Sequence, residues 1–184
     1  EKALQWYQRA LYGYEAKMGA SHPDTLNTVN NIAVVYQKQG MYKKARDWYE
    51  RALKGREEKL GSSHPDTLNT VHNMASFFYH QGKYEKALQW YQRALYGRIE
   101  KLGSTHPDTL ETVNNMAVVY KNQGNYAKAL QWYEKMVDGY EAGLGSPHPD
   151  TLNNMALLYQ YQGNYDKALQ SYQRALEGRE AKLE

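Results

Sequence analysis

Histidine, aspartate and threonine recur together along this chain in one fixed order. The pentapeptide His-Pro-Asp-Thr-Leu begins at His22, His64, His106 and His148, at intervals of 42 residues. Proline in the first turn of a helix needs no amide partner, and aspartate there favours the positive end of the helix dipole. The motif therefore predicts four regularly spaced helix starts rather than one site where reactive groups converge.

Other groups that could do chemistry are present, but their spacing does not bring them together. His72, Ser76 and His80 would line one side of a helix, with the two imidazoles about two turns apart, too far to share one metal ion. The carboxylates are scattered along exposed helix faces, no glycine-rich loop could cradle a phosphate, and the chain has no cysteine. We therefore expect no catalytic residue, no metal, no cofactor and no enzyme activity.

The composition limits the kinds of partner. The 184 residues carry 23 basic and 20 acidic side chains, and a net charge of +3 is too small to indicate a nucleic-acid groove. No apolar run approaches the ~18 residues of a membrane span, and no signal peptide is visible. We expect a cytoplasmic protein, because the lack of cysteine fits a reducing compartment. We also expect a fragment of a longer chain, because Glu1 falls inside a predicted helix.

Each repeated unit contains two amphipathic helices joined by a short Gln-Gly turn. Apolar residues recur at helical spacing on one face of each helix, and the glycine suits the positive φ of a helix end. In the first full unit the apolar positions are Leu26, Val29, Ile32, Ala33 and Tyr36, then Ala45, Trp48, Tyr49, Ala52 and Leu53. No period-two alternation appears, so the predicted fold class is all-α. The predicted helices span 2–18, 23–38, 42–60, 65–80, 84–102, 107–122, 126–143, 150–161 and 165–182.

The units form one array with irregular ends. We divide it into a lone second helix over 1–20, repeats over 21–62, 63–104 and 105–146, and a shortened repeat over 147–184. The interval between Gly124 and Gly163 is 39 residues instead of 42. Three residues are therefore missing just after the last His-Pro-Asp-Thr, and the counterpart of Leu110 is lost. A single hairpin of this size cannot bury its apolar face, so stacking on neighbouring hairpins must stabilise it.

Two residue types recur in the second helices of the units. The first is a central glycine, which costs about 1 kcal/mol relative to alanine; it predicts a close helix–helix approach, with inheritance by duplication as the alternative. These glycines are Gly13, Gly55, Gly97, Gly139 and Gly178. The second is a tryptophan on the apolar stripe, which we expect to pack in the core or between repeats rather than to form a recognition ladder. The tryptophans are Trp6, Trp48, Trp90 and Trp132, with Ser171 in the last unit.

These positions resemble the tetratricopeptide repeat. The family pattern of the first helix is matched by Val29, Ile32, Ala33 and Tyr36, and that of the second by Tyr42, Ala45, Tyr49 and Ala52. The usual period is about 34 residues. The longer form is similar to the repeats of kinesin light chains and to the C-terminal arrays of fungal NLR-like proteins. The resemblance implies a right-handed α-solenoid of stacked antiparallel hairpins, with the first helices lining the inner surface.

A candidate groove lies on the side of each first helix that faces away from its core. Its positions vary between units, whereas the core positions hardly vary, as expected of a fixed scaffold with an adjustable surface. Amide side chains donate and accept hydrogen bonds, and they suit the main chain of a bound peptide. The candidate residues are Asn27, Asn30, Val34, Gln37, Lys38, Asn69, His72, Ser76, Tyr79, His80, Glu111, Asn114, Val118, Lys121, Asn122, Asn153, Leu157, Gln160 and Tyr161. We exclude Asn31, Asn73, Asn115 and Asn154, because they match a family position that is usually structural.

Two functional hypotheses follow. In the first, the chain is a protein-interaction scaffold that binds a peptide or protein segment in this concave groove. In the second, it is a structural module that forms homo-oligomers, because repeat ends expose mutually complementary faces. Neither hypothesis includes a nucleic-acid or membrane partner.

Overall fold

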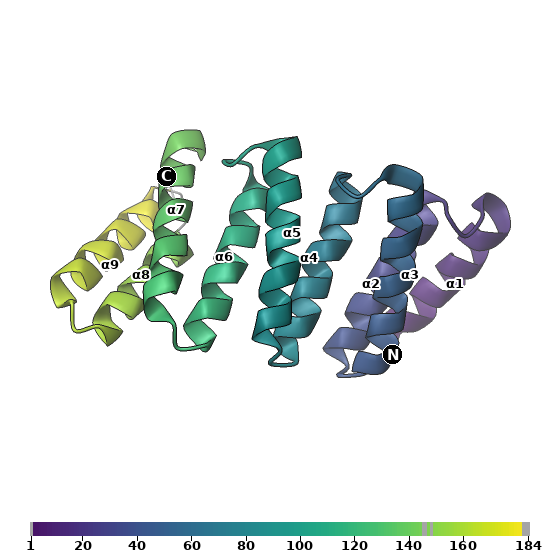
Figure 1. The fold of residues 1–184 in the computed structure, drawn as a ribbon, viewed down its shortest axis with the longest axis horizontal. Coiled ribbons are helices and arrows are strands. Elements are labelled where there is room, and N and C mark those ends of the chain that lie inside the picture. Colours follow the sequence, from purple (N-terminus) through teal and green to yellow (C-terminus); the bar gives the residue numbers. More distant parts are fainter. Residues whose placement is uncertain (1, 145–146, 148, 182–184) are drawn as a thin grey trace. The chain divides into compact units, whose positions relative to one another are not determined.

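The structure is a computed structural model that describes residues 2–144, 147 and 149–181. In this part of the chain all regular secondary structure is α-helical (Figure 1). The helices are α1 (Lys2–Met18), α2 (Pro23–Lys38), α3 (Tyr42–Leu60), α4 (Pro65–His80), α5 (Tyr84–Leu102), α6 (Pro107–Asn122), α7 (Tyr126–Leu144), α8 (Pro149–Tyr161) and α9 (Tyr165–Glu180). Their bounds agree with the predicted ranges to within two residues, because the stop and start signals of each unit are local.

The recurring His-Pro-Asp-Thr motif begins a helix, as predicted, and the histidine has a role of its own. Nδ1 of His22 accepts a hydrogen bond from the backbone N–H of Asp24 at 3.3 Å, which makes the imidazole the N-cap of α2. The Thr25 hydroxyl donates to the carbonyl of Gly19 at 2.9 Å and ties the new helix to the loop before it. The same two bonds recur at the starts of α4 and α6, through His64, Thr67, His106 and Thr109. His148 lies outside the described residues.

The Gln-Gly turn reverses the chain between the helices of each hairpin. Gly40 has a φ of +72°, which L side chains rarely adopt. Its N–H donates to the carbonyl of Gln37 at 3.0 Å, while the N–H of Met41 donates to the carbonyl of Tyr36 at 2.9 Å. This pair of bonds is a Schellman motif, and it satisfies carbonyls that the end of α2 would otherwise leave without a partner.

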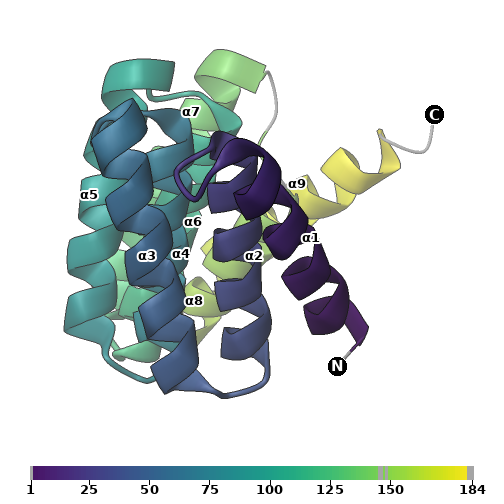
Figure 2. The same ribbon diagram turned by 90° about the vertical axis from the view of Figure 1, so that its right-hand side faces the viewer.

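Contacts divide the chain into two compact units, residues 1–97 and 98–184, with the division inside α5. In unit 1, α2 contacts α1, its hairpin partner α3, and α4 (Figure 2). The core of this unit contains most of the predicted apolar positions of α2 and α3, together with residues of α1, α4 and α5. In unit 2, α6 packs on α7, and α8 contacts both α7 and α9. Its core is formed in the same way from α6, α7, α8 and α9.

A buried arginine joins α3 to the helix that follows it. Nη1 of Arg56 donates to the carbonyl of Asp66 at 2.7 Å and to the hydroxyl of Thr70 at 2.6 Å. Nη2 donates to Oδ1 of Asn27 on α2. Burial lowers the pKa of the Arg56 guanidinium, and the neighbouring Asp66 raises it. Arg98 makes the equivalent bonds to Asp108 and Thr112 in unit 2. No local pattern in the sequence indicates this link.

Candidate functional site

In unit 1, the accessible side of α2 follows one line along the helix. Asn27, Asn31 and Lys38 are exposed, and Val34 between them is half-buried. These positions fall at i, i+4, i+7 and i+11, so they share one face of the helix. Asn27 is held in place, because its Oδ1 accepts from the buried Arg56. The line therefore presents amide groups on a fixed backbone.

The helix α4 continues this surface beside α2. Asn69 and His80 are exposed, whereas Ser76 and Tyr79 are half-buried. Two side-chain bonds connect the helices directly. Nδ2 of Asn73 donates to Oδ1 of Asn30 at 3.3 Å, and Nε2 of Gln37 donates to Oγ of Ser76 at 3.5 Å. We call the accessible residues on this side of the two helices the α2–α4 surface; they are Asn27, Asn31, Val34, Gln37, Lys38, Asn69, Asn73, Ser76, Tyr79 and His80.

Two of the predicted site residues are not on the surface. Asn30 and His72 are each only 7 % exposed, so the expectation that they face solvent in the groove was wrong. Asn30 bonds to Asn73 of α4, and the His72 ring lies edge-on against Tyr91 with 5.2 Å between ring centroids. The contact between α2 and α4 covers Asn30, and the contact with Tyr91 of α5 covers His72.

The asparagines that were excluded from the predicted groove are accessible in the structure. Asn31 is exposed, and Asn73 is half-buried, so both belong to the α2–α4 surface. Their signal in the sequence is the spacing from Asn27 to Lys38, which runs through Asn31 and not through Asn30.

Unit 2 carries its own candidate residues on α6 and α8. On α6, Glu111 and Asn122 are exposed, and Asn114, Val118 and Lys121 are half-buried. On α8, Asn153 is half-buried, whereas Leu157, Gln160 and Tyr161 are exposed. The Tyr161 ring stacks on Tyr126 at 5.7 Å between centroids. All nine of these predicted residues are therefore at least partly accessible.

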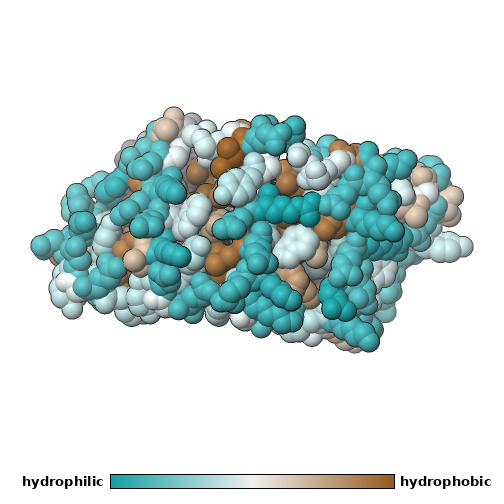
Figure 3. Space-filling view, viewed as in Figure 1, coloured by the Kyte–Doolittle hydropathy of each residue, from teal (hydrophilic) through white to brown (hydrophobic). Residues whose placement is uncertain are grey.

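The other groups singled out in the sequence do not form a reactive centre. Among the described residues, no cluster of three or more histidine, aspartate or glutamate side chains could hold a metal ion. Trp48 and Trp90 pack against the core of unit 1 and Trp132 against that of unit 2, as predicted, whereas Trp6 is largely exposed. Within the same part of the chain, no helix has the length and apolar character needed to cross a membrane. The face in Figure 3 is mostly hydrophilic, with apolar residues in small separate patches.

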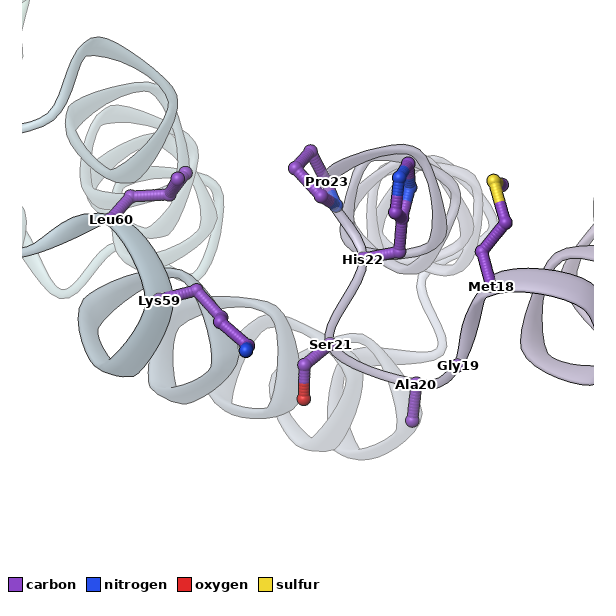
Figure 4. A pocket seen from close by; sticks show the side chains of 8 residues that line it. All are labelled: Met18, Gly19, Ala20, Ser21, His22, Pro23, Lys59 and Leu60. Carbon is purple, nitrogen blue, oxygen red and sulfur yellow. The ribbon is translucent and has the colours of Figure 1, made fainter.

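A crevice of about 400 Å³ lies where α1 joins α2 (Figure 4). It is lined by the loop from Met18 to Pro23 and by Lys59 and Leu60 at the end of α3. Figure 4 shows Lys59 pointing toward Ser21, and the His22 imidazole already caps its own helix. Few polar groups converge in this crevice, so it is a weaker candidate than the α2–α4 surface.

The comparison with protein families identifies these hairpins. A family model for the tetratricopeptide repeat matches residues 1–58, 66–142 and 110–181. The chain belongs to the tetratricopeptide repeat family. Members of this family generally serve as protein-interaction scaffolds and generally are not enzymes. A comparison with curated proteins finds no significant sequence match.

Solved structures share the fold of this tetratricopeptide chain. BtubC (BKLC) from P. vanneervenii is 25 % identical, with a TM-score of 0.83 over 98 % of this chain and 73 % of that one. The Podosopora anserina putative kinesin light chain with nearly identical TPR-like repeats is 22 % identical, with a TM-score of 0.78 over 100 % of this chain and 88 % of that one. MamA is 18 % identical, with a TM-score of 0.66 over 98 % and 89 % of the two chains. These similarities confirm the predicted all-α, tetratricopeptide-like solenoid class and the kinesin-light-chain-like form of the repeat.

Proposed function

We propose that this chain binds an extended peptide or protein segment along the first helices of its hairpins. The observation that carries the proposal is the row of accessible amides at Asn27, Asn31 and Asn69 above a packed core. We also propose that the chain consists of a lone helix over 1–20 and repeats over 21–62, 63–104, 105–146 and 147–184. The proposal includes the cytoplasmic location expected from the absence of cysteine.

The α2–α4 surface has the chemistry that a peptide main chain requires. Asparagine and glutamine side chains offer both a donor and an acceptor, which an extended backbone presents in alternation. The positions of the amide side chains on this surface are set before a peptide binds, because Arg56 holds Asn27 and the Gln37–Ser76 bond links α2 to α4. A preorganised surface loses little conformational entropy when a ligand binds. Lys38 at the edge adds a charge, and His80 adds a further polar group, that would select among peptides.

The test uses a peptide selected from a random-sequence display library against the whole chain. A triple variant, Asn31→Ala, Lys38→Ala and His80→Ala, removes accessible side chains without opening the core. We expect its affinity for the selected peptide to fall at least about tenfold. The control is Lys54→Ala with Glu58→Ala on α3, where both side chains are largely exposed. Equal affinities for the triple variant and the wild type would contradict the proposal.

The alternative function, self-assembly, is supported by the apolar side of α9. Leu169 and Leu176 are 67 % and 57 % exposed, and a second copy could cover them. Light scattering across a wide concentration range tests this hypothesis. A molar mass that rises with concentration, and that stays constant in Leu176→Glu, would favour self-assembly. A constant monomer would exclude it.

A further inference from the structure

A second pocket in unit 1, of about 390 Å³, gathers positive charge. It lies where α3 begins and α4 ends. The α2–α3 and α4–α5 turns are at this end of the hairpins, which is the lower end in Figure 1. Lys43 and Arg46 on α3 line it together with Lys83 and Lys86 at the start of α5. Of the described residues in its lining, Glu50 is the one with a carboxylate.

The floor of this pocket is aromatic. Phe77 is 2 % exposed and meets the Tyr42 ring edge-on, with 6.0 Å between centroids. Phe78 is half-buried and stacks on Trp90 at 6.3 Å. The Nζ atom of Lys86 lies 5.8 Å from the centre of the Phe78 ring, a cation–π distance. The basic side chains therefore surround a group of aromatic rings whose positions are fixed by packing.

Most of the basic and aromatic residues of this pocket are peculiar to one junction between hairpins, whereas Lys86 and Tyr42 have a lysine and a tyrosine as counterparts in the other units. Because the units repeat, each position has counterparts at the same place in the equivalent helices or turns of the other units. The counterparts of Arg46 are Leu88, Leu130 and Leu169, those of Lys43 are Glu85, Ala127 and Asp166, and those of Lys83 are Met41, Asn125 and Asn164. The chain contains only two phenylalanines, and both are here, at positions where other units have valine, leucine or tyrosine. Folding does not require the residues that are peculiar to this junction, which are Lys43, Phe77, Phe78, Arg46 and Lys83, since the other units fold without them.

The charges of the pocket are only partly balanced within the chain. Arg46 lies 3.7 Å from Glu50 and 3.9 Å from Asp47, both in exposed pairs. Lys83 donates to the neutral amide of Gln81 at 2.6 Å, which leaves its charge in place. Gathering like charges is unfavourable, and an anionic ligand would relieve the repulsion. The pocket therefore favours an acidic group with an apolar part.

We propose that this pocket binds an acidic peptide segment, with carboxylates on the four basic side chains and one apolar side chain on the floor of Tyr42, Phe77 and Phe78. A peptide supplies both features at a spacing that a free anion does not. The pocket is separate from the α2–α4 surface, and the inference does not rest on the function proposed above.

The test measures fluorescence anisotropy with a labelled peptide of six glutamates around a central phenylalanine. The double variant Arg46→Leu and Lys83→Asn places at each position a residue that the chain already carries at its counterparts, so the helices are preserved; circular dichroism checks this. We expect the double variant to bind the peptide at least about tenfold more weakly. The control Lys54→Glu changes an exposed lysine and lowers the net charge by the same amount, and we expect it to bind within about twofold of the wild type.

Three further outcomes decide the inference. A peptide with glycine in place of the phenylalanine is expected to bind more weakly, and inorganic pyrophosphate is expected to compete poorly. Equal affinity of both peptides, with efficient displacement by pyrophosphate, would overturn the peptide assignment and leave an anion site. Equal loss in the double variant and in Lys54→Glu would overturn the pocket, because net charge alone would then explain binding. The triple variant of the α2–α4 surface is expected to bind this peptide normally; its failure would move the site there.

Discussion

Gly55 of α3 and Leu26 of α2 are so close that no side chain fits between them. A Cβ placed on Gly55 would lie 2.6 Å from Cδ2 of Leu26, which is 2 % exposed. Gly97 and Leu68 repeat this relationship, as do Gly139 and Leu110. At Gly178 the nearest atom would be Cγ of Pro149, at 3.5 Å, because the three-residue deletion removes the matching leucine. The close approach predicted from the recurring glycine is therefore confirmed in three hairpins and absent at Gly13 and Gly178.

This difference predicts opposite effects for one substitution at two glycines. Gly55→Ala gains helix propensity but forces the buried Leu26 to move, and we expect a net loss of about 1–2 kcal/mol in the free energy of unfolding. Gly178→Ala gains the same propensity at a position where the added Cβ makes only an ordinary contact, at 3.5 Å from Pro149, and we expect a gain of about 0.5–1 kcal/mol. Urea unfolding followed by circular dichroism measures both. Equal effects of the two substitutions would mean that the leucine contact is unimportant.

A second prediction concerns the buried arginine. In Arg56→Lys the single ammonium group cannot reach Asp66, Thr70 and Asn27 together, so we expect a loss of about 1–3 kcal/mol in the free energy of unfolding. Arg179→Lys is the control. Arg179 bonds to Asp150 at 3.2 Å with both side chains more than half exposed, so its loss should stay below about 0.5 kcal/mol. Similar losses in both variants would contradict a special role for Arg56.

A third prediction is a loss of stability at alkaline pH through Tyr49. Burial raises the pKa of its phenol well above the ordinary value of 10.0. The folded state therefore holds the proton more tightly than the unfolded state. This contribution is complete below about pH 10 and is lost as the pH rises further, by at most about 1.4 kcal/mol per pH unit.

The variant Tyr49→Phe isolates this effect from the titration of lysines. At neutral pH we expect it to be less stable by about 1 kcal/mol, because the hydroxyl donates to Oε1 of Gln37 at 2.8 Å. Between pH 9 and pH 11, on either side of the reference pKa, its stability should fall less steeply than that of the wild type. Parallel curves from urea unfolding at each pH would show that the Tyr49 phenol does not titrate with unfolding.

A fourth prediction compares the same leucine position in two hairpins. Leu53 on α3 is 8 % exposed, whereas its counterpart Leu176 on α9 is 57 % exposed. We expect Leu53→Ala to cost about 2–4 kcal/mol, because it leaves a cavity in the core of unit 1. Leu176→Ala should cost less than about 0.5 kcal/mol in dilute solution. A large cost at Leu176 that grows with protein concentration would instead indicate that a second copy covers it.

Sequence by itself determined the helices and their order, because their signals are local and repeat with one period. His-Pro-Asp at each start, Gly40 and its counterparts at each turn, and apolar residues at helical spacing define the hairpins without any knowledge of packing. The deletion in the last unit also identified in advance the hairpin that lacks the counterpart of Leu110, which explains why an added Cβ at Gly178 would meet only an ordinary contact.

Only the tertiary structure decided which polar residues face solvent. A helical wheel treats one buried face at a time, but α2 contacts α1, α3 and α4, and this third contact buries Asn30 and leaves Asn31 exposed. The packing of the hairpins also brings Arg56 to three acceptors on two helices. The same packing gathers Lys43, Arg46, Lys83 and Lys86 around one aromatic floor. These groups are far apart in sequence, and no local pattern specifies their distance, because that distance depends on how the hairpins pack.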